Sequence, residues 1–101
     1  DYKRFIPATI NDPGVTGEAV KVFGALAGTE NVKEMGLIMG SEDFSYFQQK
    51  VPGTFFFLGS GNAAKGTDNA HHHPRFNVDE DALPLGAACL AGFAWSRLCG
   101  K

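Results

Sequence analysis

The sequence is poor in cysteine and has no excess of positive charge, and each shortage excludes a class of protein. Its 101 residues include two cysteines, Cys89 and Cys99, which lie too far apart along one predicted helix to bridge each other. We expect both thiols to be reduced, which favours a cytoplasmic location. The formal net charge is −2, so neither nucleic acid nor an anionic membrane is expected as a partner.

Long hydrophobic runs and complete catalytic motifs are absent as well. No uninterrupted apolar stretch approaches the roughly 20 residues of a membrane span, and the N-terminal "DYKRFIPATI" has no signal-peptide core. The sequence contains no H-E-x-x-H or C-x-x-C metal motif, no G-x-S-x-G elbow and no G-K-[ST] phosphate loop. These absences predict a soluble chain without a complete catalytic set of its own, and the length of 101 residues predicts at most one domain.

The apolar pattern that is present predicts alternating strands and helices. This order favours an α/β fold, in which helices pack on the faces of a parallel or mixed sheet. The ends of the second and third strands would then open on the same edge of the sheet. Strands are expected at residues 2–10, 35–39 and 54–59, and helices at residues 15–28, 41–51 and about 80–98.

Two of these helices carry specific signals. Ser41 is expected to be the N-cap of its helix, because Glu42 and Asp43 then lie in the first turn, where the helix dipole favours carboxylates. Pro84 has no N–H group, so it must lie in the first turn of the last helix. One stripe of that helix is expected to face the core; it consists of Leu85, Ala88, Cys89, Gly92, Phe93 and Ser96.

Three adjacent histidines, His71, His72 and His73, form the most distinctive chemical feature of the sequence. Imidazole is the commonest metal ligand, but adjacent side chains point in different directions, so only one of the three is expected to bind a given ion. The alternative is a polar loop with no metal. No other set of ligands is recognisable, so any companions of a histidine ligand would lie elsewhere.

The segment "GSEDF", residues 40–44, is a second candidate site. Gly40 would let the backbone approach a ligand, and the N–H groups at a helix start can bind a carboxylate or an oxyanion. The alternative is a helix cap with no further function, and the local pattern favours that alternative.

Three segments in order resemble the C-terminal stretch of the metal-dependent N-acyl-amino-acid amidohydrolases. They are "PATINDP", "MGSEDFSYFQQKVPGTFFFLG" and "HHHPRFNVDEDALPLGAACLA". That family includes hippurate hydrolase, the bacterial aminoacylase/carboxypeptidase group and the plant hydrolases of indole-acetyl amino acids. The resemblance implies that residues 1–12 end a lid or dimerisation domain, and that residues 13–101 form the C-terminal half of a split, metallopeptidase-like catalytic domain.

The resemblance also implies a reaction and site residues. The complete enzyme would cleave the amide bond of N-acyl amino acids or small peptides, with a water between two divalent ions of Zn, Mn, Co or Ni and a glutamate as general base. The family pattern H-x-P-x-[FY] falls on His72, Pro74 and Phe76, which makes His72 the implied metal ligand. Gly40, Ser41 and Glu42 would line the substrate pocket.

The same resemblance implies partners for this chain. The other ligands and the catalytic glutamate would belong to an N-terminal half of the catalytic domain that this sequence lacks, so the fragment alone is expected to be inactive. The full-length enzyme would be a homodimer. The alternative is a freestanding, non-catalytic α/β module for binding or assembly.

Overall fold

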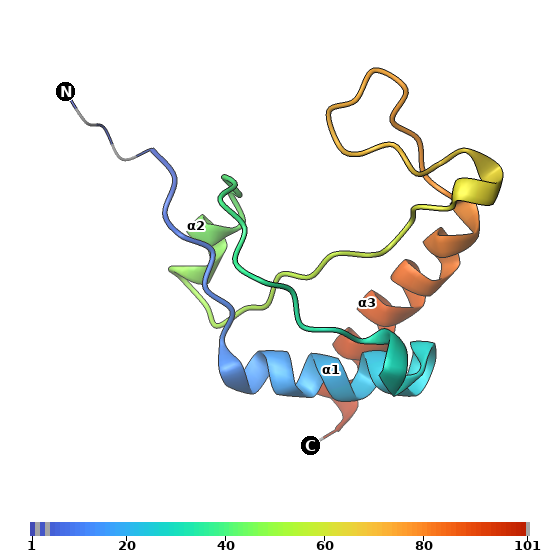
Figure 1. The fold of residues 1–101 in the computed structure, drawn as a ribbon. Helices are drawn as coiled ribbons and strands as arrows, with labels where there is room; N and C mark the ends of the chain where they lie inside the picture. Colours follow the sequence, from blue (N-terminus) through green and yellow to red (C-terminus); the bar gives the residue numbers. More distant parts are fainter. Residues whose placement is uncertain (2, 4, 101) are drawn as a thin grey trace. The chain divides into compact units, whose positions relative to one another are not determined.

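The computed structural model describes residues 1, 3 and 5–100, and in this range it contains helices joined by long segments without regular structure (Figure 1). The chain divides into two compact units, one ending at Phe56 and the other starting at Phe57. The α-helices are α1 (Pro13–Ala27), α2 (Ser45–Gln48) and α3 (Leu83–Cys99), and the single-turn 3-10 helices are η1 (Thr29–Asn31), η2 (Ala63–Lys65) and η3 (Glu80–Ala82).

The predicted α/β class, with a mixed or parallel sheet, is wrong, because the described residues contain no β-strand. Residues 35–39 and 54–59 have the apolar pattern of strands but form no ladder, and of residues 2–10 the described positions are not strand either. A strand persists only when a neighbouring strand pairs its N–H and C=O groups, and an apolar run cannot supply that neighbour. Leu37 and Met39 are fully exposed as a result.

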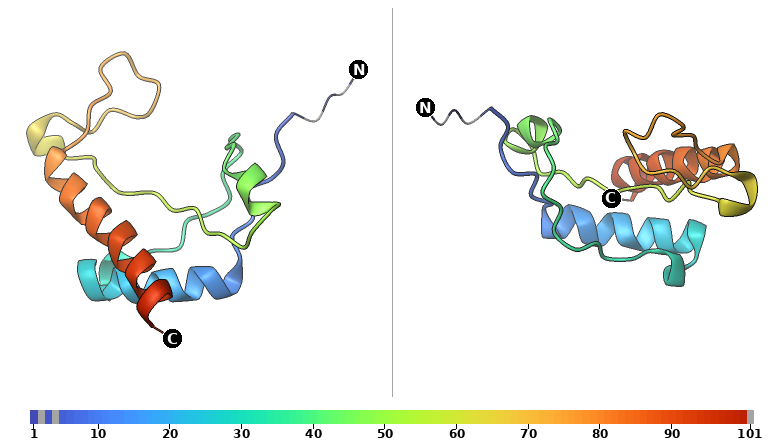
Figure 2. Two further views of the ribbon diagram at one scale, coloured as in Figure 1. Left: turned by 180° about the vertical axis from the view of Figure 1, so that it is seen from behind. Right: turned by 45° about the horizontal axis from the view of Figure 1, so that its top comes forward.

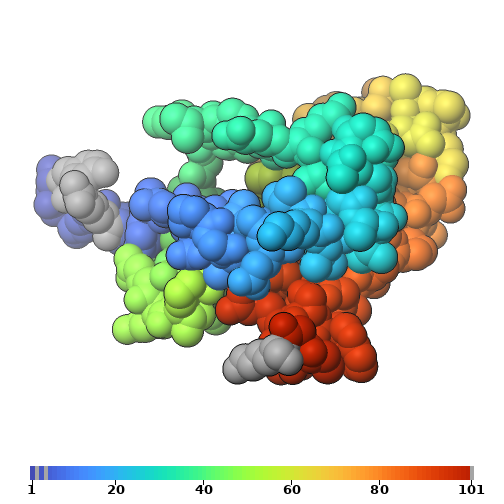
Figure 3. Space-filling model, turned by 90° about the horizontal axis from the view of Figure 1, so that it is seen from below, coloured from blue at the N-terminus to red at the C-terminus, as the bar shows by residue number. Residues whose placement is uncertain are grey.

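Helix α1 forms where it was predicted, and starts two residues earlier, at Pro13. Asp12 is its N-cap: the side-chain oxygen accepts a hydrogen bond from the N–H of Val15 at 2.8 Å. Pro13 fits the first helical position because its missing N–H needs no partner there. Val15, Ala19 and Phe23 are buried at helical spacing. Part of α1 lies at the surface (Figure 3). Val20 and Leu26 of this helix are exposed.

The expected N-cap at Ser41 is wrong, because α2 is a single turn that starts at Ser45. Glu42 organises this turn instead. Its carboxylate accepts a hydrogen bond from the Phe44 N–H at 3.0 Å, and its carbonyl accepts one from the Ser45 hydroxyl at 2.8 Å. A side chain that bonds its own backbone two residues later competes with a helix starting at that point, so the helix begins later.

Helix α3 forms where it was predicted, but it starts at Leu83 and not near residue 80. Pro84 lies in its first turn, and η3 leads into it. The predicted stripe is its covered side, where Cys89 is buried and the other five residues are half-buried. The other side is apolar and exposed: Leu83 by 52%, Leu90 by 60%, Trp95 by 70% and Leu98 by 79%.

Within the segment Glu80–Cys99, an 18-residue window has a mean hydropathy of 1.3, so by length and composition alone this segment could cross a membrane. Core helices of soluble proteins satisfy the same criterion. A helix that is apolar on all sides needs apolar cover on all sides. The expectation that the protein has no membrane partner stays a prediction.

Candidate functional site

The three histidines lie in the loop between η2 and η3, which leaves the 3-10 turn and returns to the start of α3 (Figure 2). Two backbone hydrogen bonds shape its tip. The His73 N–H donates to the Ala70 carbonyl at 3.2 Å, and the Phe76 N–H donates to the His73 carbonyl at 2.9 Å. All three histidines are exposed on this folded tip.

The three imidazoles have different surroundings. The His71 ring packs edge-on against Phe76, with the ring centres 4.8 Å apart. The His73 Nδ1 atom accepts a hydrogen bond from the Arg75 N–H at 3.1 Å. His72 has a φ of 66°, and it is the only residue other than glycine with a positive φ in the described part of the chain.

A left-handed backbone at a residue other than glycine costs of the order of 1 kcal/mol and persists only where the surrounding structure enforces it. The His72 ring also lies edge-on to that of His71, with the ring centres 6.4 Å apart. The backbone conformation of His72, and not its ring contacts, therefore distinguishes it from the other two histidines.

Both ends of the histidine loop meet at Asp79. The Asp79 N–H donates to the Ser60 carbonyl at 2.8 Å. The Asp79 carboxylate accepts hydrogen bonds from the Asn62 side-chain amide and from the Lys65 ammonium, each at 2.7 Å. Lys65 also contacts the carboxylate of Asp81. We call Asn62, Lys65 and Asp79 the loop clamp.

These contacts shift the protonation of the two charged groups in the loop clamp. The hydrogen bonds from Lys65 and then Asn62 lower the pKa of Asp79 below its ordinary value. The hydrogen bonds to Asp79 and then Asp81 raise the pKa of Lys65. Both groups are therefore charged over the whole neutral range, so the clamp is closed at physiological pH.

The predicted substrate-binding residues lie in the other unit. Gly40 and Ser41 are exposed, and Glu42 is half-buried, with its carboxylate engaged at the start of α2. A side chain at position 40 would meet only Ile38, at 3.6 Å, so the local structure itself does not require a glycine there.

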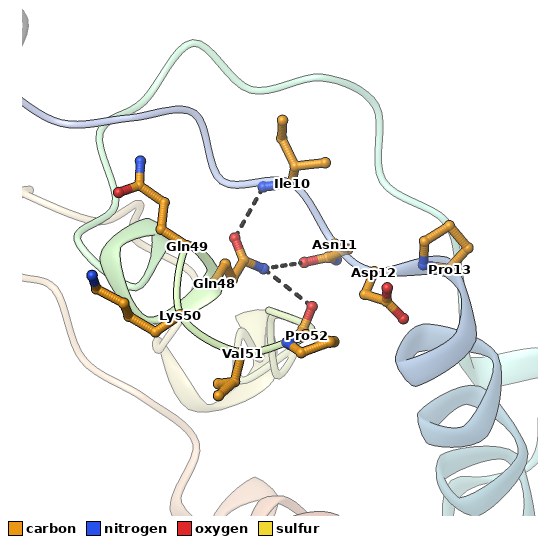
Figure 4. A pocket seen from close by; sticks show the side chains of 10 residues that line it. Ile10, Asn11, Asp12, Pro13, Gln48, Gln49, Lys50, Val51 and Pro52 are labelled. Atoms are coloured by element: carbon orange, nitrogen blue, oxygen red, sulfur yellow. Dashed lines mark hydrogen bonds between the residues drawn. The ribbon is translucent and has the colours of Figure 1, made fainter.

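A hollow of about 490 Å³ lies between residues 10–13 and 48–53, and none of the predicted site residues lines it (Figure 4). Its polar groups bond one another. The Gln48 side chain accepts a hydrogen bond from the Ile10 N–H at 3.0 Å and donates to the side-chain oxygen of Asn11 at 3.2 Å and to the Gly53 carbonyl at 3.3 Å. The hollow is therefore a structural junction.

The sequence patterns did not reveal this junction or the loop clamp. In both cases the signal is weak: a polar side chain next to an apolar or glycine-rich segment, whose partner lies far along the chain. For Asn11 and Gln48 that separation is 37 positions, and for Lys65 and Asp79 it is 14.

In the part of the chain that the structure describes, the metal-ligand donors do not form a site by themselves. No group of three or more His, Cys, Asp or Glu side chains in the described residues could hold one. The histidine loop offers exposed imidazoles, and one of them would fit as one ligand of a site completed by residues from outside this chain.

Comparison with known proteins identifies the class. Residues 1–96 match the peptidase family M20/M25/M40, and the chain belongs to that family. It is 44% identical over 94 residues to IAA-amino acid hydrolase ILR1-like 4 of Arabidopsis thaliana, an alignment that covers 93% of this chain and 21% of the relative. It is 47% identical over 85 residues to Thermostable carboxypeptidase 1 of Saccharolobus solfataricus, covering 84% of this chain and 21% of the relative.

The predicted resemblance to amidohydrolases and carboxypeptidases is thus confirmed. The chain spans about a fifth of the length of these relatives.

Proposed function

We propose that this chain is the C-terminal part of a metal-dependent amidohydrolase that cleaves N-acyl amino acids or small peptides. The observation that carries the proposal is the family match over residues 1–96. The names of the two relatives describe hydrolysis of amino-acid conjugates and of peptides, two substrate classes joined through an amide bond.

His72 would be this chain's ligand in a site for two divalent ions of Zn, Mn, Co or Ni; enzymes of the family are generally metal-dependent. When bound, such ions supply Lewis acidity and lower the pKa of a water molecule. The role of His72 is to hold an imidazole nitrogen at a fixed position. Its left-handed backbone, which His71 and His73 do not share, supports this role.

Gly40, Ser41 and Glu42 would line the substrate pocket. The exposed backbone of Gly40 and the exposed hydroxyl of Ser41 could contact a polar substrate group. The Glu42 carboxylate already accepts the Phe44 N–H, so its role would be to hold the segment and not to move a proton.

The remaining four-fifths of the enzyme would supply the other metal ligands and the general base, and would cover the apolar surfaces that this chain exposes. The exposed side of α3 and residues 35–39 present large apolar side chains that favour burial. The fragment alone would be inactive, and the complete enzyme would be a homodimer.

The test is to express the longer reading frame that contains this chain and to assay hydrolysis of N-acyl amino acids. His72→Ala is expected to abolish hydrolysis and to weaken metal binding, whereas His73→Ala should retain most of both. Asp68→Asn is a control, because Asp68 is exposed in the same loop and makes no hydrogen bond or ion pair with the described residues. Full activity of His72→Ala would remove the metal role of this residue.

A further inference from the structure

We propose that the loop clamp, Asn62, Lys65 and Asp79, positions His72 by fixing both ends of the loop that carries it. The inference rests on the proposed function and assigns these three side chains as positioning residues, which act through the loop and touch neither metal nor substrate.

The first step is that Asp79 closes the loop at its base. Its N–H donates to the carbonyl of Ser60 on the incoming segment at 2.8 Å, and its carboxylate bonds Asn62 and Lys65 beyond that point. Asp79, which follows the histidines in the chain, thereby bonds three residues that precede them: Ser60, Asn62 and Lys65. A loop closed at its base has fewer conformations, so its tip is better defined.

The second step is that the incoming end is itself rigid. The Asn62 N–H donates to the hydroxyl of Thr67 at 3.1 Å, and the Thr67 N–H donates to the Asn62 carbonyl at 3.0 Å. Thr67 is only 7% exposed. The Asn62 side chain also accepts from the Ala64 N–H at 3.1 Å and caps η2. Asn62 therefore joins the folded η2 turn to Asp79.

The third step is that the outgoing end is anchored to α3. The Asp79 carboxylate accepts the Asp81 N–H at 3.2 Å and so caps η3, which runs directly into α3. The histidine loop is thus tied to the longest helix of the described residues through the same carboxylate that binds Lys65. A displacement of Asp79 would be transmitted to the loop and to the start of the helix together.

The Lys65–Asp79 contact also differs from an ordinary surface ion pair. The Asp79 side chain is 15% exposed, whereas Asp81, the other partner of Lys65, is 86% exposed. Pairs in open solvent contribute little, but a carboxylate mostly withdrawn from water depends on its hydrogen-bond donors. Losing Lys65 would leave Asp79 with fewer donors and favour opening of the base.

The test uses the complete enzyme, freed of metal and titrated with Zn²⁺ alone by calorimetry. Asp79→Asn and Lys65→Met are expected to weaken zinc affinity roughly tenfold or more, the range seen for residues that orient metal ligands. Lys65→Arg keeps the charge and the donors and should restore it, and Asp68→Asn should match the wild type. Amide hydrogen exchange across residues 66–78 should accelerate in the first two variants only.

The outcomes separate this inference from the proposed function. If His72→Ala loses zinc affinity while Lys65→Met binds zinc like the wild type, the loop clamp has no positioning role and the proposed function stands. If His72→Ala also binds and hydrolyses normally, the proposed function fails. Should Asp79→Asn not fold, Lys65→Met decides alone, because Lys65 is about half exposed. If Lys65→Met loses zinc affinity and Lys65→Arg does not restore it, the positioning role of the loop clamp is also overturned.

Discussion

In each compact unit, one junction of side chains joins two segments that are not paired in a sheet. The two junctions differ in their chemistry. In the unit ending at Phe56, the Asn11 side chain accepts the Phe55 N–H at 2.7 Å and donates to the Phe55 carbonyl at 2.8 Å. These are the two bonds that a residue on a neighbouring strand would make. In the other unit, the loop clamp joins its segments through the Asp79 carboxylate, which accepts from the Lys65 ammonium and the Asn62 amide.

This difference determines whether each junction depends on pH. An amide offers a donor and an acceptor and has no charge to lose, so Asn11 can bond both polar groups of Phe55 at any pH. In the loop clamp, the bond between Lys65 and Asp79 has its full strength only while both groups are ionised. We therefore expect the strength of the Asn11 junction near α1 to be independent of pH, and that of the loop clamp to depend on pH.

The largest effect is expected from Asn11→Ala, which removes both bonds to Phe55 and one to Gln48. At about 1 kcal/mol for each hydrogen bond to the peptide group, the free energy of unfolding should fall by about 2 kcal/mol. Urea unfolding of the chain measures this change. Asn69→Ala is the matched control, since Asn69 makes no hydrogen bond with the described residues. Equal stability of the two variants would show that the Asn11 junction is not a support.

A pH titration should separate the two junctions next. The lowered pKa of Asp79 means that its stabilisation is complete above the ordinary value of 3.8 and is lost as the pH falls through the lowered value. The raised pKa of Lys65 means that its stabilisation is complete below the ordinary value of 10.5 and is lost as the pH rises through the raised value.

Amide chemical shifts in two-dimensional NMR spectra report both limbs of this profile. The amide signals of Asn62 and Asp79 should shift at both the acidic and the basic end of the titration, whereas the amide signal of Phe55 should stay constant. In Asp79→Asn the acidic limb should disappear. A Phe55 amide that follows the same profile would mean that the two junctions are not chemically distinct.

The same contrast explains what the sequence could and could not predict. Helices α1 and α3 were predictable because their signals are local: the cap at Asp12, a proline in the first turn and an apolar stripe at helical spacing. Residues 35–39 and 54–59 were wrongly predicted as strands because pairing depends on a neighbour that the segment cannot encode. At Ser41, local competition from Glu42 moved the helix start.

For the candidate site, the spacing of His72 from Pro74 and Phe76 matches the family pattern and so implies that His72 is the ligand. Spacing alone cannot predict the backbone angle of His72. The left-handed conformation of His72 arises from the turns at Ala70 and His73, and the loop clamp from partners 14 and 17 positions apart. Such pairs become visible only when the chain is folded.

The smallest effect is expected from salt, and it would sharpen the comparison within the loop clamp itself. Screening shortens the reach of charges to about 3 Å at 1 M ionic strength, from about 30 Å at 0.01 M. The Lys65–Asp81 contact should weaken first, because the Asp81 side chain is 86% exposed, whereas Asp79 is 15% exposed. In a salt titration followed by NMR, the carboxyl carbon signal of Asp81 should shift, and that of Asp79 should shift less. The side-chain amide signal of Asn11 should stay unchanged. If Asp79 responds as strongly as Asp81, its contact with Lys65 is an ordinary surface pair, and Asn62 alone would then hold the base of the loop.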